Sequence, residues 1–401
     1  MSAGTRGALE GILVADFSRV VAGPFAAMLL GDLGADVVKV ERPGAGDDTR
    51  GFGPPFVDDG AGGTTSSYYL SVNRNKKGVA WDLAVPEARE KARRLAERAD
   101  VLIENFKPGS ATRLGLSYEQ LSEANPGLVY CSVSGFGWGE EGSRLPGYDF
   151  LAQAVGGLMS ITGDPPESGG EPRKVGVAVV DVLTALFAAN AITAALYERR
   201  TSGLGQRVRV DLLSSSLATL INQASTYLTS GRVPRAMANR HPSIAPYETL
   251  AAADRALVVA VGNDGQFASF TRVIGRGELA SDPRFSTNKA RVTNREEMVA
   301  VLEACLSSRP AAEWVEGLQR AGVPSGVVND ISEAFALAER LGLSPSVEVS
   351  EGSARAHVAA RTDPSAQVSN PIGLSRTPVS YRLPPPRLGQ HSAEVEADLE
   401  V

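Results

Sequence analysis

Short apolar runs alternate with longer segments of mixed polarity along the first 136 residues. The apolar runs predict strands at residues 11–18, 35–41, 78–83, 100–106 and 127–136. The mixed segments predict helices at residues 22–34, 86–99 and 117–125. Strands and helices that alternate in this order are typical of a parallel sheet with right-handed crossovers. We therefore expect an open, doubly wound α/β domain, whose ligands bind beyond the carboxyl ends of its strands.

The pattern changes after residue 136. A Gly-rich loop (137–149) precedes a short helix with a glycine break (149–163) and an exposed loop (163–174). A long helix then ends in the basic and glycine residues of 199–205, which suit a helix C-terminus, and residues 205–216 predict a strand that leads into a helix.

The amino-acid composition of the chain changes near residue 236. The pattern predicts strands at 255–263 and 322–330, helices at 265–275, 295–306 and 311–321, and hairpin-like strands within 334–387. We therefore expect a smaller α/β domain over about residues 246–330.

One aspartate interrupts the apolar run KVGVAVVDVLTALFAANAI (174–192). Residues 175–197 have about the length that a bilayer requires, but the many alanines, with Thr184, Asn190 and Thr193, favour a buried helix in a soluble protein. The aspartate is Asp181. It either caps the first turn of the long helix, where the helix dipole stabilises an anion, or it serves as a catalytic carboxylate.

Composition excludes several classes of protein. The formal net charge of −6 argues against a nucleic-acid-binding protein with a large basic face. Two cysteines, Cys131 and Cys305, and three scattered histidines form neither a disulfide framework nor a metal-binding motif, so we expect no metal site. Free thiols, and an N-terminus without a signal-type apolar core, lead us to expect a cytoplasmic protein without a membrane partner.

Basic residues in loops are candidates for an anion site. In ERPGAGDDTRGFGPPF (41–56), Arg42 and Arg50 flank glycines and either bind phosphate or are solvated. In SVNRNKKGVAWDL (71–83), a short basic run is more typical of a solvated turn.

Two further stretches contain candidate ligand-binding residues, each with a structural alternative. In ENFKPGSATRLGL (104–116), Asn105 and Phe106 end a strand where α/β sheets place ligands, and Lys107 and Arg113 add positive charge; a solvent loop is the alternative. Asp149 is expected to be the N-cap of the helix that follows, with the neighbouring Tyr148 packed beneath it.

Several of these motifs together resemble a known family. LEGILVADFSRVVAGPFAAMLLGDLGADVVKVERPGAGDDTR, NRNKKGVAWDL, DVLIENFKPG, PGYDFLAQAVGG, GQRVRVDLL, NRHPSIAPYETL, VAVGNDGQF and AGVPSGVVND are similar to the class III CoA-transferases, the CaiB/BaiF group. The resemblance covers about residues 9–391.

The resemblance implies a fold and an assembly. It implies a Rossmann-like open parallel sheet in a large domain, residues 1–220, completed by about 375–401. A linker (221–245), a small α/β domain (246–330) and a return segment (331–374) would complete the chain. Members of the family form homodimers of interlocked rings, so we expect an intertwined homodimer.

The resemblance also implies a reaction. The family moves CoA from an acyl-CoA donor to a carboxylic acid acceptor through an aspartyl anhydride and an aspartyl-CoA thioester, and its nucleophile matches Asp181. CoA and acyl-CoA would be substrates, with no tightly bound cofactor. The positions that match CoA contacts are Val21, Ala22, Arg42, the stretch from Trp81 to Ala84, Asn105, Phe106, Lys107, Arg113, Tyr148 and Asp149.

Departures from the family pattern narrow the substrate. Formyl-CoA transferases have a glutamine in place of Val21 and a glycine-rich flap in place of ANRHPSIAPY, so formyl or oxalate exchange is not expected. The related racemases have a histidine in place of Tyr148, which argues against an isomerase. The NRHPSIAPY segment is more similar to members that act on dicarboxylates.

Some choices stay open on the sequence alone. A racemase or epimerase, and a non-catalytic acyl-CoA-binding protein, are the alternatives to a transferase. Arg19, Arg144, Arg240 and His241 are the candidates to bind a second carboxylate, and the sequence does not choose among them.

Overall fold

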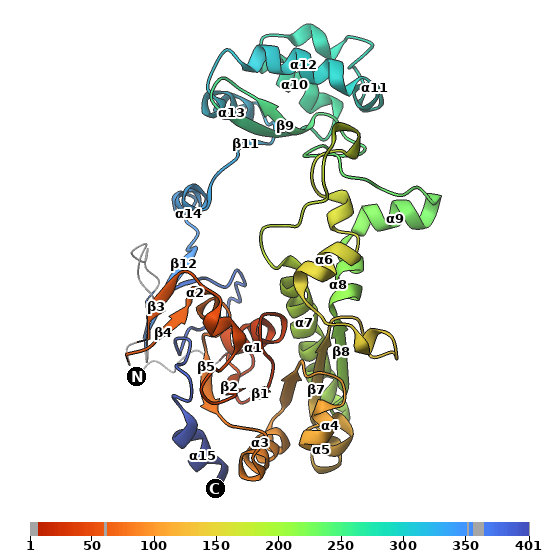
Figure 1. The fold of residues 1–401 in the computed structure, drawn as a ribbon. Helices are drawn as coiled ribbons and strands as arrows, with labels where there is room; N and C mark the ends of the chain where they lie inside the picture. The colour runs from red at the N-terminus through yellow and green to blue at the C-terminus, as the bar shows by residue number, and fades with distance from the viewer. Residues whose placement is uncertain (1–6, 60–61, 351–352, 356–364, 401) are drawn as a thin grey trace. The chain divides into compact units, whose positions relative to one another are not determined.

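The computed structural model describes residues 7–59, 62–350, 353–355 and 365–400. The chain divides into two compact units (Figure 1). The first comprises Met1–Leu158, Lys174–Gly231 and Gly342–Val401, and the second comprises Met159–Arg173 and Arg232–Leu341. Residues 159–173, which we placed in the large domain, therefore cluster with the second unit. Residues 221–231, which we expected in a linker, cluster with the first.

A parallel sheet of six strands forms the centre of the first unit. Its strands are β1 (Leu13–Asp16), β2 (Asp36–Glu41), β5 (Lys76–Ala80), β6 (Val101–Glu104), β7 (Val129–Ser134) and β8 (Arg207–Asp211). They lie in the order β5-β2-β1-β6-β7-β8, and every pair is parallel. This is the 3-2-1-4-5-6 order of a Rossmann-like sheet, so the expected parallel α/β fold is confirmed. The order reverses between β1 and β6.

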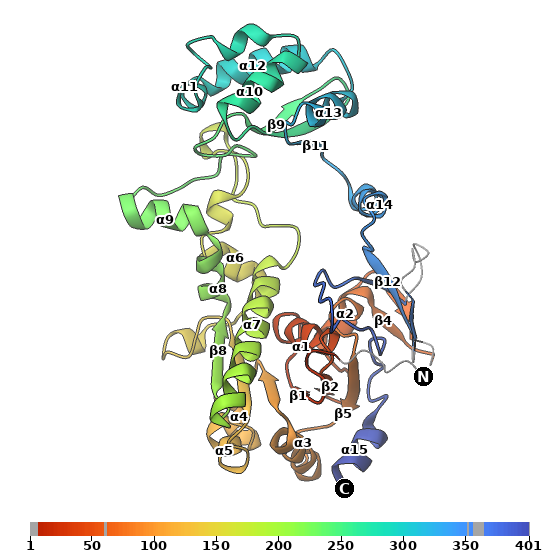
Figure 2. The same ribbon diagram turned by 180° about the vertical axis from the view of Figure 1, so that it is seen from behind.

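Helices cover both faces of this sheet (Figures 1 and 2). One face packs against α1 (Ala22–Asp32) and α7 (Val179–Ser202), and the other against α3 (Pro86–Arg98), α5 (Tyr118–Ala124) and α15 (Ser392–Glu400). Because alternate side chains of a strand point to opposite faces, Val14 joins the first core and its neighbour Ala15 joins the second. The predicted helices of the first 136 residues occur within two residues of their expected ends.

The long apolar helix α7 is partly buried. By length and composition it could cross a membrane, but 44% of its most apolar 18-residue window is buried inside the protein. Val180, Ala185, Ala188 and Ile192 contribute to the core beneath it. The strand-like residues before Asp181 do not form a strand, since residues 175–178 are loop and bend and α7 begins at Val179. That no membrane is involved stays a prediction.

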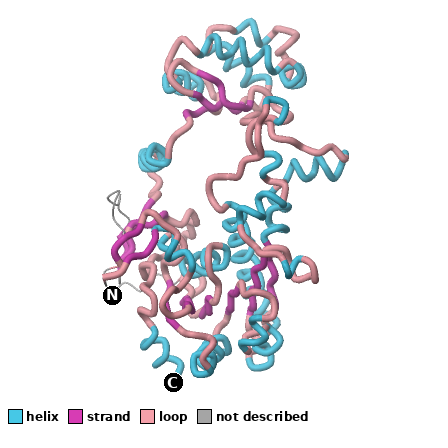
Figure 3. Tube along the Cα trace, in the orientation of Figure 1, coloured by secondary structure: helices cyan, strands magenta, loops and turns pink. Residues whose placement is uncertain are grey.

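Smaller elements complete the first unit. They are the hairpin β3 (Phe56–Asp58) and β4 (Thr64–Ser66), the helices α2 (Ser67–Leu70), α4 (Ser110–Leu114), α6 (Asp149–Val155), α8 (Leu212–Thr219) and α9 (Ile221–Ser230), and the strands β12 (Ser346–Ser350), β13 (Ser353–Arg355) and β14 (Ala366–Val368). Figure 3 distinguishes these helices and strands by colour.

The C-terminal segment packs onto the N-terminal part of the first unit. Asn370 Nδ2 donates to Asp32 Oδ2 over 2.9 Å, and the Ser380 amide donates to the Asp32 carbonyl oxygen. Trp81 Nε1 donates to Glu396 Oε1 over 2.9 Å, while Val395 of α15 enters the core.

The second unit contains an antiparallel sheet in the order β11-β10-β9. Its elements are β9 (Tyr247–Ala251), β10 (Ala256–Ala260), α10 (Asp264–Val273), α11 (Asn288–Thr293), α12 (Arg295–Leu306), α13 (Ala311–Arg320), β11 (Ser325–Val327) and α14 (Ile331–Arg340). Phe267, Leu302 and Trp314 anchor its core. The hairpin-like pattern expected from residue 334 is wrong for its first part. Asp330 and Glu333 form a capping box that starts α14 there instead.

Candidate active site

A cavity of about 280 Å³ lies in the first unit, where the strand order reverses. The turn after β1 contributes Arg19, Val20, Val21 and Ala22 to its wall, and the segment after β6 contributes Asn105–Pro108. The carboxyl ends of β1 and β6 diverge at this point, because their helices leave toward opposite faces of the sheet. The cavity therefore lies where the parallel sheet predicts a ligand. We call it the acyl cavity.

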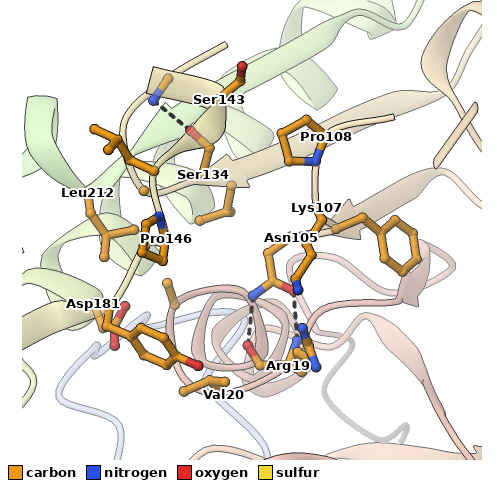
Figure 4. A pocket seen from close by; sticks show the side chains of 18 of the residues that line it. Arg19, Val20, Asn105, Lys107, Pro108, Ser134, Ser143, Pro146, Asp181 and Leu212 are labelled. Atoms are coloured by element: carbon orange, nitrogen blue, oxygen red, sulfur yellow. Dashed lines mark hydrogen bonds between the residues drawn. The ribbon is translucent and has the colours of Figure 1, made fainter. Parts of the chain in front are cut away.

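The turn after β1 has a strained conformation that two polar side chains hold. Val20 has a φ of 70°, a left-handed value that is costly for a β-branched residue. The Asn105 side chain accepts from the Arg19 amide (3.1 Å) and donates to the Arg19 carbonyl oxygen (2.8 Å), as Figure 4 shows. Both carboxylate oxygens of Asp47 accept from the Val20 amide, at 3.2 and 3.3 Å.

Asp47 is itself held by buried groups. Its Oδ2 lies 2.9 Å from Lys39 Nζ, and both side chains are fully buried. Burial opposes ionisation, but the Lys39 ammonium and the hydrogen bonds from Thr49 lower the pKa of Asp47 to about 2. The strained turn is thus tied to a carboxylate that stays charged.

Asp181 lines the acyl cavity from the first turn of α7. Figure 4 shows it on the side of the cavity opposite Asn105 and Lys107. The residue is only 9% exposed. Burial, and then the negative charge of Asp149, raise the pKa of Asp181 to about 7. Such a carboxylate is more basic, and hence more nucleophilic, than one in water.

Asp149 caps α7 rather than its own helix. Its Oδ1 accepts from the amides of Val180 (2.8 Å) and Asp181 (3.2 Å). It is the first residue of α6, so the N-cap that we expected there is wrong, and Tyr148 does not pack beneath it. Tyr148 is 63% exposed and lines the acyl cavity.

A second cavity, of about 440 Å³, adjoins the first. Its wall includes Arg42, Trp81, Leu83 and Ala84, and it shares Arg19, Phe106 and Lys107 with the acyl cavity. The shared residues place the two cavities side by side, with the cationic side chains of Arg19 and Lys107 between them, and we call the pair the groove. We call the second one the distal cavity. An extended ligand with phosphates near its middle suits such a groove.

Most of the residues that we expected to contact CoA line this groove. Val21, Ala22, Asn105, Tyr148 and Asp181 lie in the acyl cavity, Arg42, Trp81 and Ala84 in the distal cavity, and Phe106 and Lys107 in both. Arg113 lines neither cavity and donates to Ser110 Oγ over 2.7 Å. Asp149 acts behind the acyl cavity, through α7.

Several basic residues singled out in the sequence have structural roles. Arg50 pairs with Glu41 and stacks on Tyr69, so it is not a free phosphate ligand. The basic run from Arg74 to Lys77 is not a solvated turn either, because Lys76 and Lys77 already belong to β5. Arg74 pairs with Asp32, and Lys76 with Asp16, and these four side chains are almost entirely buried.

Three residues near the groove are not among the site residues predicted from the sequence. Asp47 holds the turn after β1, and Asp48 lines the acyl cavity while it pairs with both Arg19 and Arg42. Tyr68 lies close enough to Asp181 and Asp149 that their charges, after burial, raise its pKa. The GDD within the Gly-rich stretch (46–48) was the available signal for the first two. Nothing in the sequence marked Tyr68.

The four candidates to bind a second carboxylate lie in different places, and one of them lines the acyl cavity. Arg19 lines the acyl cavity, whereas Arg144 is exposed and pairs with Glu140. Arg240, in the second unit, pairs with Glu296 and lies 3.5 Å from Glu248, and the ring of His241 packs against Tyr247. Within the described ranges, no group of three or more His, Cys, Asp and Glu side chains could hold a metal ion.

Comparison with known proteins identifies the family. The pattern of CoA-transferase family III matches residues 9–392. The chain belongs to CoA-transferase family III. It is therefore an enzyme, and its groove is the candidate CoA site of a family III transferase.

Individual relatives cover almost the whole chain. It is 42% identical to the succinate–glutarate CoA-transferase of Agrobacterium fabrum, over 98% of this chain and 96% of the relative. It is 40% identical to the succinyl-CoA:glutarate CoA-transferase of Mus musculus, over 96% and 85% of the two chains. A solved CaiB/BaiF family protein from Brucella suis superimposes with a TM-score of 0.86, at 39% identity, over 98% of this chain and 100% of that one.

Proposed function

We propose that this enzyme transfers CoA from an acyl-CoA to a carboxylic acid, with Asp181 as the nucleophile. The Asp181 carboxylate attacks the thioester carbonyl carbon, the C–S bond breaks, and an aspartyl anhydride and CoA thiolate form. The thiolate then attacks the aspartyl carbonyl carbon, which gives an aspartyl-CoA thioester and releases the donor acid. The acceptor carboxylate repeats these two steps in reverse order and leaves with CoA. Each step exchanges one acyl bond for another, so the pathway needs no oxidant and no metal.

The observation that carries this proposal is the position of Asp181. Its buried carboxylate lines the acyl cavity at the point where the strand order reverses, and its pKa is raised to about 7 by burial and by Asp149. A basic carboxylate in a partly dry cavity attacks a thioester better than a solvated one. Hydrolysis of the anhydride is also slower where water is excluded.

CoA is proposed to bind along the groove. Its adenine end would lie in the distal cavity near Trp81 and Ala84, and its phosphates would lie near the junction, where Arg19 and Lys107 supply positive charge. The thioester would then reach Asp181. We propose no tightly bound cofactor, because CoA itself carries the acyl group.

A small dicarboxylate is the proposed acceptor. Both relatives described above carry succinyl or succinate and glutarate in their names. Of the candidates for the second carboxylate, Arg19 is the one that lines the acyl cavity. A screen of succinyl-CoA, acetyl-CoA and branched acyl-CoAs against mono- and dicarboxylates, read by mass, would identify the pair of substrates. Faster turnover with monocarboxylates contradicts the proposed acceptor class but leaves the transferase chemistry intact.

The nucleophile is tested by trapping. The enzyme is incubated with succinyl-CoA, treated with hydroxylamine or borohydride, and digested for peptide mass spectrometry. We expect the modification on Asp181 and no transfer activity in Asp181→Ala. Modification of another residue, or full activity of Asp181→Ala, would refute the mechanism. Exchange of an α-hydrogen for solvent deuterium without an acceptor acid would indicate a racemase instead.

The active assembly is proposed to be a homodimer in the cytoplasm. The consecutive helices α7, α8 and α9 expose large apolar side chains, among them Tyr197, Leu217, Ile221 and Leu228. Exposed apolar side chains on neighbouring helices favour an interface, and a second copy of the chain is the simplest partner.

A further inference from the structure

Gln153 is a fully buried amide behind the acyl cavity. It lies on α6 one turn after Asp149, and its exposed fraction is 0%. Its Nε2 donates to Asp149 Oδ2 (2.6 Å) and to the Val177 carbonyl oxygen (3.3 Å), and its Oε1 accepts from the Val175 amide (2.9 Å). Burying an amide is costly unless its polar atoms find partners, and here each finds at least one.

These hydrogen bonds connect α6 to the start of the nucleophile helix. The N-cap residue of α7, Ala178, has no side chain that can cap the helix. Asp149 supplies the cap instead, because its Oδ1 accepts from the Val180 and Asp181 amides while its Oδ2 accepts from Gln153. Gln153 thus orients the cap on one side and holds residues 175–177, which lead into α7, on the other.

The bonded atoms also matter electrostatically. Asp149 is the charged neighbour that raises the pKa of Asp181 after burial. Gln153 is a neutral donor, so it compensates part of the Asp149 charge without adding another charge. A glutamate of the same shape would place a second carboxyl group beside Asp149 and, once both are ionised at high pH, a second negative charge.

We propose that Gln153 is a positioning residue for the transfer reaction. Its carboxamide locks the Asp149 cap and the segment before α7, and so holds the Asp181 carboxylate in the position from which it attacks. This inference rests on the proposed role of Asp181 as the nucleophile.

Other charged and titratable groups also face Asp181. Asp149 approaches from α6 and Tyr68 from α2, and Arg19, Asp48, Lys107 and Tyr148 line the same cavity. Replacing Gln153 leaves all of these side chains in the protein, so a change in the pH dependence reports on how Asp149 and Asp181 are arranged.

The test compares Gln153→Met and Gln153→Glu with the wild type. Gln153→Met retains the shape but loses the hydrogen bonds. We expect kcat for succinyl-CoA to fall roughly 10- to 100-fold, because a nucleophile displaced by a fraction of an ångström attacks far more slowly. KM for succinyl-CoA should change little, since the groove itself is untouched.

The pH midpoint of kcat/KM should move upward, because Asp149 loses its neutral donor, and Gln153→Glu should move it further.

Gln120→Met is the control for the loss of a helix-start amide away from the groove, at an exposed position. Gln120 also bonds backbone groups at a helix start, since its Oε1 accepts from the Ser117 amide, but it lies on α5 and lines neither cavity of the groove. Its variant should lose stability without a shift of the pH midpoint. Binding of free CoA by calorimetry, and thermal melts, are measured for every variant. If Gln153→Met does not fold, Gln153→Glu still retains an acceptor for the Val175 amide and carries the test.

The outcomes separate this inference from the proposed function. Wild-type kcat and an unmoved pH midpoint in folded Gln153→Met and Gln153→Glu would overturn the role of Gln153, while trapping on Asp181 would still support the mechanism. A uniform loss of activity at every pH, with no shift of the midpoint, would also overturn it in favour of a purely structural role. Trapping on another residue in the wild type would refute the proposed function itself.

Discussion

At the scale of single residues, the properties that suit Asp181 for attack also cost stability. Its side chain is buried, and the charged group that acts on it is another carboxylate, Asp149. Ionising a carboxylate there is unfavourable, which is what a pKa of about 7 expresses. The α7 N-terminus offsets part of this cost, but Asp149 uses the Val180 and Asp181 amides. The ionised Asp181 carboxylate therefore lowers the free energy of unfolding of the protein.

Asp181→Asn should consequently stabilise the protein at high pH. The folded-state pKa is raised from 3.8 to about 7, so the folded protein binds the proton more tightly than the unfolded chain does. The penalty is absent below the unfolded pKa, grows as the pH rises through this window, and is complete above about 7. At pH 8 the asparagine should add on the order of 3 kcal/mol to the free energy of unfolding, and less at pH 5.

Denaturant unfolding at the two pH values checks this prediction. Asp398→Asn, a change at an exposed carboxylate on α15, serves as the control and should show no such gain. Equal stability of Asp181→Asn and wild type at pH 8 would mean that ionising the Asp181 carboxylate in the folded protein costs no stability.

At the scale of elements, the turn between β1 and α1 is shaped by its surroundings rather than by its own sequence. Val20 is in a left-handed conformation that valine avoids in isolation. Asn105 from the end of β6 and Asp47 from the loop after β2 hold it there. Strain of this kind persists only where several contacts impose it, and it is common beside ligand sites.

Asn105→Ala should therefore impair CoA binding. The variant loses both hydrogen bonds to Arg19, so we expect about 1–3 kcal/mol less stability and a roughly 10-fold weaker affinity for CoA. Asn125→Ala is a matched control, because Asn125 also bridges backbone groups, at Glu97, Ala99 and Gly127, but between α5 and β7. It should lose comparable stability and keep its affinity for CoA in calorimetry. Equal CoA affinities in the two variants would contradict a role for the turn.

At the scale of the whole molecule, the first unit is assembled from parts that are distant in the sequence. Asp32 at the end of α1 binds Arg74, Asn75 and Asn370, and α15 closes the core over β5 and α3. These contacts join the last residues of the chain to the first strands. Removal of the segment from residue 365 onward would leave the Asp32 carboxylate short of a partner and uncover apolar core.

The apolar side chains of α7–α9 predict self-association. Ile221 and Leu228 are 74% and 79% exposed in the single chain. Light scattering of the wild type should give twice the mass of one chain. The double variant Ile221→Lys, Leu228→Lys should shift the equilibrium toward monomer, whereas Val85→Lys, at an exposed apolar position before α3, should not. A monomeric wild type, or a dimer that the double variant leaves unchanged, would count against an interface on these helices.

Local patterns in the sequence were sufficient for the alternation of strands and helices and for the class of sheet. Periodicity reports which residues are buried, and the sequence signals for β1, α1, β2, α3 and β7 agree with their neighbours. They were insufficient for α14, whose capping box outweighed a strand-like pattern, and for the residues before Asp181. Motif resemblance located Asp181 and most of the groove, because these residues follow particular strands in the chain.

Long-range contacts decided the rest. Burial of Arg74 and Lys76, the use of Asp149 as a cap for α7, and the support of Val20 by Asp47 and Asn105 all join residues that are far apart in the sequence. A charged residue looks the same in a sequence whether its partner is water, a ligand or a buried carboxylate. The sequence by itself determined which chemistry is present and the type of sheet that carries it. Only the tertiary structure decided which side chains are free to bind and which hold the nucleophile in place, because burial and partners exist only in the folded chain.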